Sequence, residues 1–132
     1  MAISYYLANQ FMKAALQGVP FTPPEEVYLA LFVTNPTAGN SGQEVSGGAY
    51  ARQLITFQEV PVQGGYSIYQ NDTDIEYPVA TTSWDTISFL GVYDALTGGN
   101  LLWYMELDQP RLTLPGDNAT VYAGSVQIQF ED

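Results

Sequence analysis

The residues best suited to chemistry form a short string of oxygen-bearing side chains: Asn71, Asp72, Asp74 and Glu76. Oxygen ligands at alternate positions on a turn can converge on a hard cation such as calcium. The string lacks the glycine and the distant bidentate glutamate of an EF-hand loop, and turns favour Asn and Asp for backbone reasons alone. We therefore expect a solvated turn with no metal and no cofactor. If a metal does bind, Asp72, Asp74 and Glu76 are the candidate ligands.

The composition excludes several common classes of catalytic site. The 132 residues include no His and no Cys, which rules out Ser-His-Asp triads, Cys-His dyads, thiolate or imidazole zinc sites and disulfides. Carboxylates remain, and a pair of them could hydrolyse a glycosidic bond. Four lie near expected strand ends, but their spacing selects no pair: Asp85, Asp94, Glu106 and Asp108. We expect a protein that is not an enzyme, with a carboxylate-based polysaccharide hydrolase as the remaining alternative.

The charge balance excludes other classes of partner. The chain carries 14 Asp and Glu against 3 Lys and Arg, for a formal net charge of -11. Such a surface repels phosphate backbones, and Lys13, Arg52 and Arg111 are too scattered to form a basic track, so we expect no nucleic acid partner. No apolar run approaches the length of a membrane span, and no basic segment precedes an apolar block. We expect a soluble protein with no membrane contact and no targeting segment.

Arg52 requires a partner of its own. It lies in an expected strand over 49–57 among aromatic and apolar neighbours, where an unpaired charge would be expensive. Glu44 in the preceding loop and Asp94 at the end of a later strand are both candidates. We predict a structural ion pair between Arg52 and Asp94, in which the planar guanidinium matches the carboxylate and fastens the adjacent hairpin, 94–100, to its neighbouring strand.

The N-terminal segment, Ser4 to Leu16, has the pattern of an amphipathic helix. Its apolar side chains recur at helical spacing in one stripe: Leu7, Phe11, Ala14 and Ala15. Ser4 suits the N-cap and Gly18 the C-cap, and a Pro-rich tether over 19–26 prevents continuation. Because so short a helix is marginal alone, it must dock on its own body or on a neighbouring subunit.

From residue 27 onward the apolar pattern changes to a period of two. The segment 27–33 is apolar on both faces, which suits a buried central strand. A glycine-rich loop follows over 37–48, and several short segments bounded by turn residues complete the chain. The sequence predicts a mainly β fold, an antiparallel β-sandwich or small barrel of about seven to nine strands with one N-terminal α-helix. We expect a single domain, 1–132, comprising the helix over 1–18, the tether over 19–26 and a β body over 27–132.

Several stretches of the chain resemble a family of small tailed-bacteriophage virion proteins, often labelled as tail fibre or head-associated proteins. The stretches are VYLALFVTNPT (27–37), EVSGGAYARQ (44–53), YPVATTSWDTISFLGVYDALTGGNLLWYMEL (77–107) and PGDNATVYAGSVQIQF (115–130). The resemblance covers most of the chain and implies a non-catalytic structural protein of a virion. It supplies no catalytic residues.

Within that class we expect a capsid decoration or cement protein, which would bind the outside of the shell and stabilise it by bridging subunits of the major capsid protein. The alternative is a tail or tail-fibre component, acting as an adaptor or a receptor-binding part and contacting other tail proteins. Either role places the protein in the virion, and we expect a homo-oligomer on the particle. The helix and the loop 37–48 are the expected contact elements, with Leu7, Phe11, Glu44 and Val45 as interface residues.

Overall fold

The computed structural model describes residues 1–131 and contains one α-helix, α1 (Tyr5–Gln17), where the sequence predicted it. The Ser4 hydroxyl accepts a hydrogen bond from the Leu7 amide, which caps the first turn. Gly18 ends the helix in the left-handed conformation, with a φ of 67° that a residue without a side chain adopts readily. Both predicted caps are confirmed.

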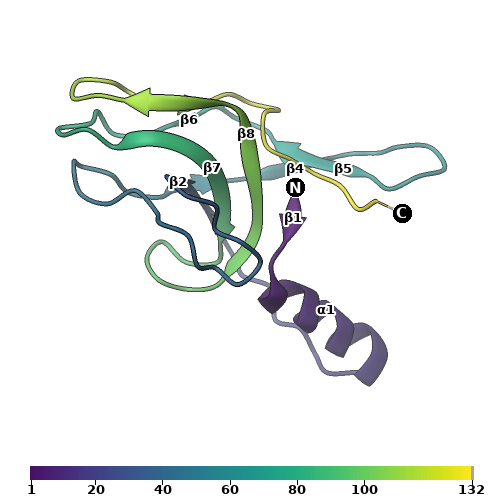
Figure 1. The fold of residues 1–132 in the computed structure, drawn as a ribbon. Helices are drawn as coiled ribbons and strands as arrows, with labels where there is room; N and C mark the ends of the chain where they lie inside the picture. Colours follow the sequence, from purple (N-terminus) through teal and green to yellow (C-terminus); the bar gives the residue numbers. More distant parts are fainter. Residues whose placement is uncertain (132) are drawn as a thin grey trace.

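The largest sheet has five strands, and all its neighbouring pairs are antiparallel. Its order is β1 (Ala2–Ile3), β8 (Leu101–Thr113), β7 (Asp85–Tyr93), β2 (Val27–Phe32) and β3 (Gln53–Ile55). β7 and β8 are long and curve together through the body of the molecule (Figure 1). β2 is an inner strand whose last four residues, 29–32, are buried, as its unbroken apolar run predicted.

Two smaller antiparallel sheets complete the fold. One has the order β10 (Gln127–Ile128), β5 (Ile68–Asn71) and β4 (Phe57–Val60), and the other pairs β6 (Ile75–Glu76) with β9 (Thr120–Val121). The hairpin of β4 and β5 extends away from the large sheet (Figure 1). The mainly β, antiparallel prediction is confirmed, and the arrangement is consistent with a β-sandwich.

Residues 101–113 form one strand, although the turn residues Asp108-Gln109-Pro110 are typical of a break between two strands. The pairing of β7 with β8 shifts between Ile87, opposite Arg111, and Phe89, opposite Glu106. Only Ser88 on β7 therefore faces the four residues 107–110. This large bulge accommodates Pro110, because a residue without an N–H is tolerated where the ladder of hydrogen bonds is interrupted.

The strand β1, which the sequence did not predict, joins the helix to the edge of the large sheet. Ala2 pairs with Tyr104 and Ile3 with Trp103. This anchoring presses the first turns of α1 onto the body, where Leu7 enters the main core cluster. The far end of α1 runs away from the strands (Figure 1). The helix docks on its own chain through its N-terminal half. No helix within residues 1–131 is long and apolar enough to cross a membrane.

An aromatic cluster of Tyr50, Tyr77 and Trp84 lies in the core beside β2. The Tyr50 ring stacks on Tyr77 with centroids 6.0 Å apart and meets Trp84 edge-on at 5.5 Å. The polar ends of the two buried rings are satisfied: the Tyr77 hydroxyl donates to the Leu29 carbonyl at 2.7 Å, and the Trp84 indole donates to the Gly48 carbonyl at 2.9 Å. The cluster thereby ties the end of the loop 37–48 to the core.

Candidate functional site

A cluster of polar side chains surrounds Arg52, between the loop 37–48 and the hairpin loop 94–100 at one end of the large sheet. The Arg52 side chain is only 8% exposed. Its Nε donates to Glu44 Oε2 and its NH2 group to Glu44 Oε1, both at 2.9 Å, which is the two-pronged geometry that a guanidinium makes with a carboxylate. Its NH1 group donates to the Ala95 and Gly98 carbonyls at 2.9 and 2.7 Å. The guanidinium carbon also lies 3.7 Å from the centre of the Tyr93 ring.

The predicted pairing of Arg52 with Asp94 is wrong, because Asp94 bonds within its own hairpin. Its Oδ1 accepts from the Asn100 amide at 2.7 Å and its Oδ2 from the Asn100 side chain at 3.0 Å. Within residues 1–131 the one ion pair is that of Arg52 with Glu44. Arg52 does fasten the hairpin, but it does so through the hairpin's carbonyls.

Tyr50 extends this cluster to β2. Its hydroxyl donates to Glu44 Oε2 at 2.5 Å and accepts from the Leu31 amide at 3.0 Å. Burial raises the pKa of Tyr50 far above its ordinary value, and the hydrogen bond and charge of Glu44 raise it further. Burial lowers the pKa of Arg52, but the hydrogen bonds and charge of Glu44 outweigh that effect and raise it overall. Because its charged and hydroxyl groups bind each other and the backbone, the cluster acts as a clamp on both loops.

The acidic side chains of the string point to separate partners or to solvent. Asp72 accepts from the Thr56 hydroxyl, Asp74 Oδ1 accepts from the Ala123 amide at 2.8 Å, and Glu76 lies exposed on β6. Among the residues that the structure describes, no group of three or more acidic side chains could hold a metal ion. The candidate ligands therefore do not converge on one site.

Asn71, the first residue of the string, has a structural role that its type alone did not reveal. It is buried, its amide donates to the Thr73 and Tyr122 carbonyls at 3.0 Å each, and its oxygen accepts from the Val126 amide at 2.9 Å. The side chain joins the turn after β5 to the C-terminal segment. Burial is the property that distinguishes it from a solvated turn residue.

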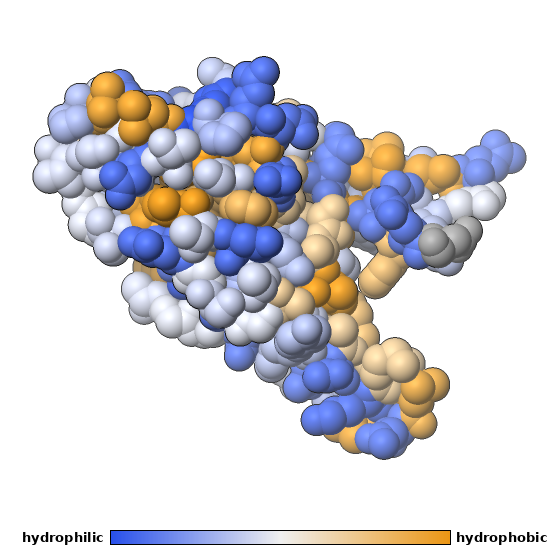
Figure 2. Space-filling view, in the orientation of Figure 1, coloured by the Kyte–Doolittle hydropathy of each residue, from blue (hydrophilic) through white to orange (hydrophobic). Residues whose placement is uncertain are grey.

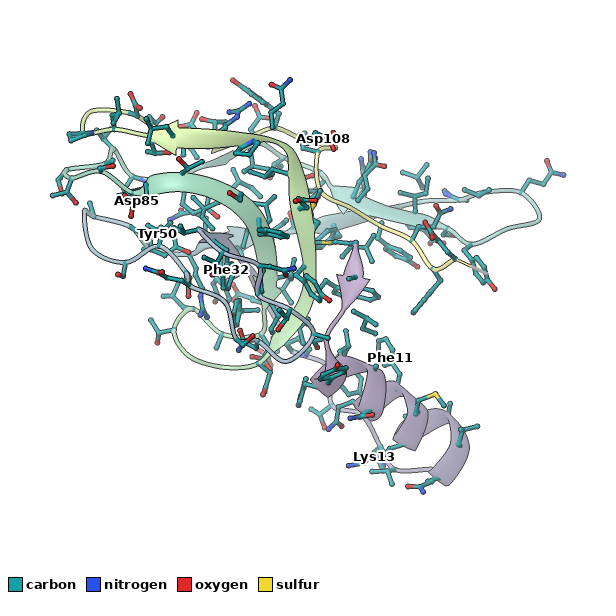
Figure 3. The ribbon with its side chains drawn as sticks, in the orientation of Figure 1. Phe11, Lys13, Phe32, Tyr50, Asp85 and Asp108 are labelled. Atoms are coloured by element: carbon teal, nitrogen blue, oxygen red, sulfur yellow. The ribbon has the colours of Figure 1, made fainter. Side chains whose placement is uncertain are left out.

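Three of the four predicted interface residues serve the chain's own fold instead. Leu7 and Val45 are buried in the core, and Glu44 holds Arg52. The loop is drawn inward because the Val45 amide donates to the Leu31 carbonyl at 2.9 Å. Phe11 is half-buried on the side of α1 that faces the strands (Figure 3). The exposed parts of the helix and loop remain available for contacts.

A mixed polar and apolar cleft and an almost entirely apolar cleft open on the surface of residues 1–131. One, of about 420 Å³, lies at the β8 bulge and is lined by Asp108 and Arg111 over an apolar floor that includes Leu90. The other, of about 300 Å³, is almost entirely apolar and includes Phe11 and Trp103.

Of the four carboxylates considered for hydrolysis, only Asp108 lines the larger cleft. Asp85 and Asp94 lie at opposite ends of β7, and Figure 3 shows Asp85 well apart from Asp108. Neither of these two clefts therefore contains a pair of the four carboxylates.

A family model described as Podophage GP4 fiber I protein gp80 matches residues 2–129. The chain belongs to this family. Membership in the fiber I family confirms the resemblance to tailed-phage virion structural proteins and supports a structural role in the virion. No curated protein matches the chain.

A double-mutant cycle tests the Arg52–Glu44 pair. Arg52→Met alone should lower the free energy of unfolding by about 2–3 kcal/mol, because it leaves a partly buried carboxylate unpaired. In Arg52→Met/Glu44→Gln the loss should be less than the sum of the single losses by at least about 1 kcal/mol, as measured by urea denaturation. The control cycle of Arg52→Met with Asp94→Asn should show a smaller coupling energy. Equal coupling in the two cycles would contradict the assignment.

Alkaline unfolding tests the buried tyrosines. Burial raises the pKa of Tyr77, as of Tyr50, above the ordinary value near 10. Above about pH 10 the unfolded chain loses these protons while the folded chain keeps them. Each of the two tyrosines should therefore make the free energy of unfolding fall by about 1.4 kcal/mol for every unit that the pH rises. Urea denaturation at a series of pH values above about 10 should therefore show that the free energy of unfolding falls less steeply with pH in Tyr77→Phe than in the wild-type protein. Trp84→Phe, which removes packing but no titrating hydroxyl, should keep the wild-type slope, and equal slopes in all three proteins would refute the prediction.

Proposed function

We propose that the protein is a non-catalytic structural component of a phage tail or its fibres. The observation that carries this proposal is the fiber I family match, which spans residues 2–129 and so includes the helix, the tether and every strand. It favours a location in the tail over one on the capsid exterior, and so favours a tail or tail-fibre component over a capsid decoration protein. On this proposal the protein resides in the tail of the virion and its partners are other tail proteins.

The geometry suits a rigid structural part. Arg52 and Glu44 fasten the two long loops to the large sheet, and the side chains that could do chemistry there are engaged in holding the fold. The acidic surface keeps such a protein soluble before assembly. A rigid body whose polar groups are bonded to one another can hold two neighbouring subunits at a fixed distance and orientation. An adaptor or fibre segment must do this.

The contact elements that we propose are the exposed parts of α1 and of the loop 37–48. In the loop, residues 37, 39–41, 43, 46 and 47 are exposed while Val45 is buried. The exposed loop residues are therefore held in place by the buried Val45. A loop fixed in this way loses less conformational entropy on binding than a free loop would. The buried positions Leu7 and Val45 are not part of this proposed surface.

Copy number in purified virions tests the tail assignment. A closed ring or fibre at the tail should contain roughly three to a few tens of copies per particle, whereas decoration of the shell would need hundreds. A quantitative gel, with the major capsid protein band of the same particles as the internal standard, measures this number. Antibody labelling of intact particles locates the protein directly. Hundreds of copies, or label spread over the shell, would reject the tail assignment in favour of capsid decoration.

A further inference from the structure

The helix α1 has a second apolar face, which its own body does not cover. Tyr5, Met12 and Leu16 are 67%, 57% and 71% exposed. Met12 and Leu16 are one helical turn apart, and Tyr5 lies two turns before Met12, so the three side chains share one side of the helix. We call them the outer face. Leu7, the one buried residue of α1, lies roughly opposite.

The position of α1 leaves this face accessible. The helix leaves the body beyond its first turns (Figure 1), and hydrophobic residues gather at its free end (Figure 2). On the inner side, Phe11 meets Phe21 of the returning tether edge-on, with ring centroids 5.6 Å apart. The tether therefore covers the inner side. A 13-residue helix with large apolar side chains in water gains stability if that surface is buried.

The charge distribution indicates what can cover the outer face. All 14 acidic residues lie at or beyond Glu25, and residues 1–24 contain Lys13 as their only charged side chain. Two bodies that approach each other elsewhere bring together surfaces of strong like charge, which opposes contact. Two copies that meet through α1 bring together the longest stretch of the chain that has no acidic residue, and the acidic bodies stay apart because the helices project from them.

We propose that the outer face of α1 packs against the same face of a second copy of this chain. The contact is self-complementary, as a two-fold interface requires. The inference goes beyond the fibre assignment and does not depend on it, because the purified chain alone suffices to test it.

Two neighbouring substitutions test the proposal with matched charge. Leu16→Glu and Gln17→Glu each add one negative charge in the last turn, so they carry the same cost against the helix dipole. They differ in that Leu16 belongs to the outer face and Gln17 does not. Sedimentation equilibrium of the wild-type chain should show self-association below about 100 µM. Leu16→Glu should raise the dissociation constant by at least about ten-fold, and Gln17→Glu by less than about two-fold.

A covalent readout supports the same test if Leu16→Glu perturbs the helix. Because the chain has no cysteine, any disulfide in a single-cysteine variant joins two copies. Under mild oxidation Leu16→Cys should form a covalent dimer faster than Gln17→Cys, since a disulfide needs the two backbones within about 7 Å. A wild-type chain that stays monomeric up to about 100 µM, equal effects of the two glutamates, or equal cross-linking of the two cysteines would overturn the proposal.

Discussion

A guanidinium removed from water must have its charge balanced and its N–H groups bonded, because an unpaired buried charge costs several kcal/mol. Arg52 meets this requirement with partners from two loops that are distant in the sequence: Glu44 before it, and Ala95 and Gly98 in the hairpin after β7. Each partner is useful only if its loop takes one path. The need of one side chain thus fixes the course of both loops at that end of the large sheet, and Tyr50 couples the result to β2 through the Leu31 amide.

The N-terminal helix follows a different rule, although its first residue touches the same loop: the Tyr5 amide donates to the Ala38 carbonyl at 2.9 Å. The helix α1 is anchored by β1 and Leu7 but leaves its outer apolar face in solvent. The Arg52 cluster therefore has its polar groups bonded and its loops held, while the projecting part of α1 exposes apolar surface in a segment free of acidic residues. That division suits a subunit that must be rigid in itself and still attach to neighbours in an assembly, as we propose for a fibre component.

Local signals made much of the fold predictable. Ser4 and Gly18 mark the helix ends by mechanisms that act within one turn, and the apolar run 27–33 indicated an inner strand. Residue types also showed that Arg52 needs a carboxylate. They did not show which one, because the choice depends on how the loop runs antiparallel alongside β2, where Glu44 lies opposite Phe32 and the Val45 amide donates to the Leu31 carbonyl. Likewise Pro110 predicted a break that the bulge absorbs, and Leu7 and Phe11 drew attention to the helix face that is covered. Head and tail proteins face the same physical demands, so the family match was needed to favour the tail.

The claim that Arg52 holds both loops is tested most directly by native-state hydrogen exchange of Arg52→Lys. Lysine keeps the positive charge but lacks the planar fork that reaches Glu44 and the hairpin together. The amides of Leu31 and Val45 should exchange at least about ten-fold faster than in the wild-type protein, while the Asn71 amide, which donates to the Val126 carbonyl outside the Arg52 cluster, should keep its rate. Unchanged exchange at Leu31 and Val45, or equal acceleration at all three amides, would contradict the account.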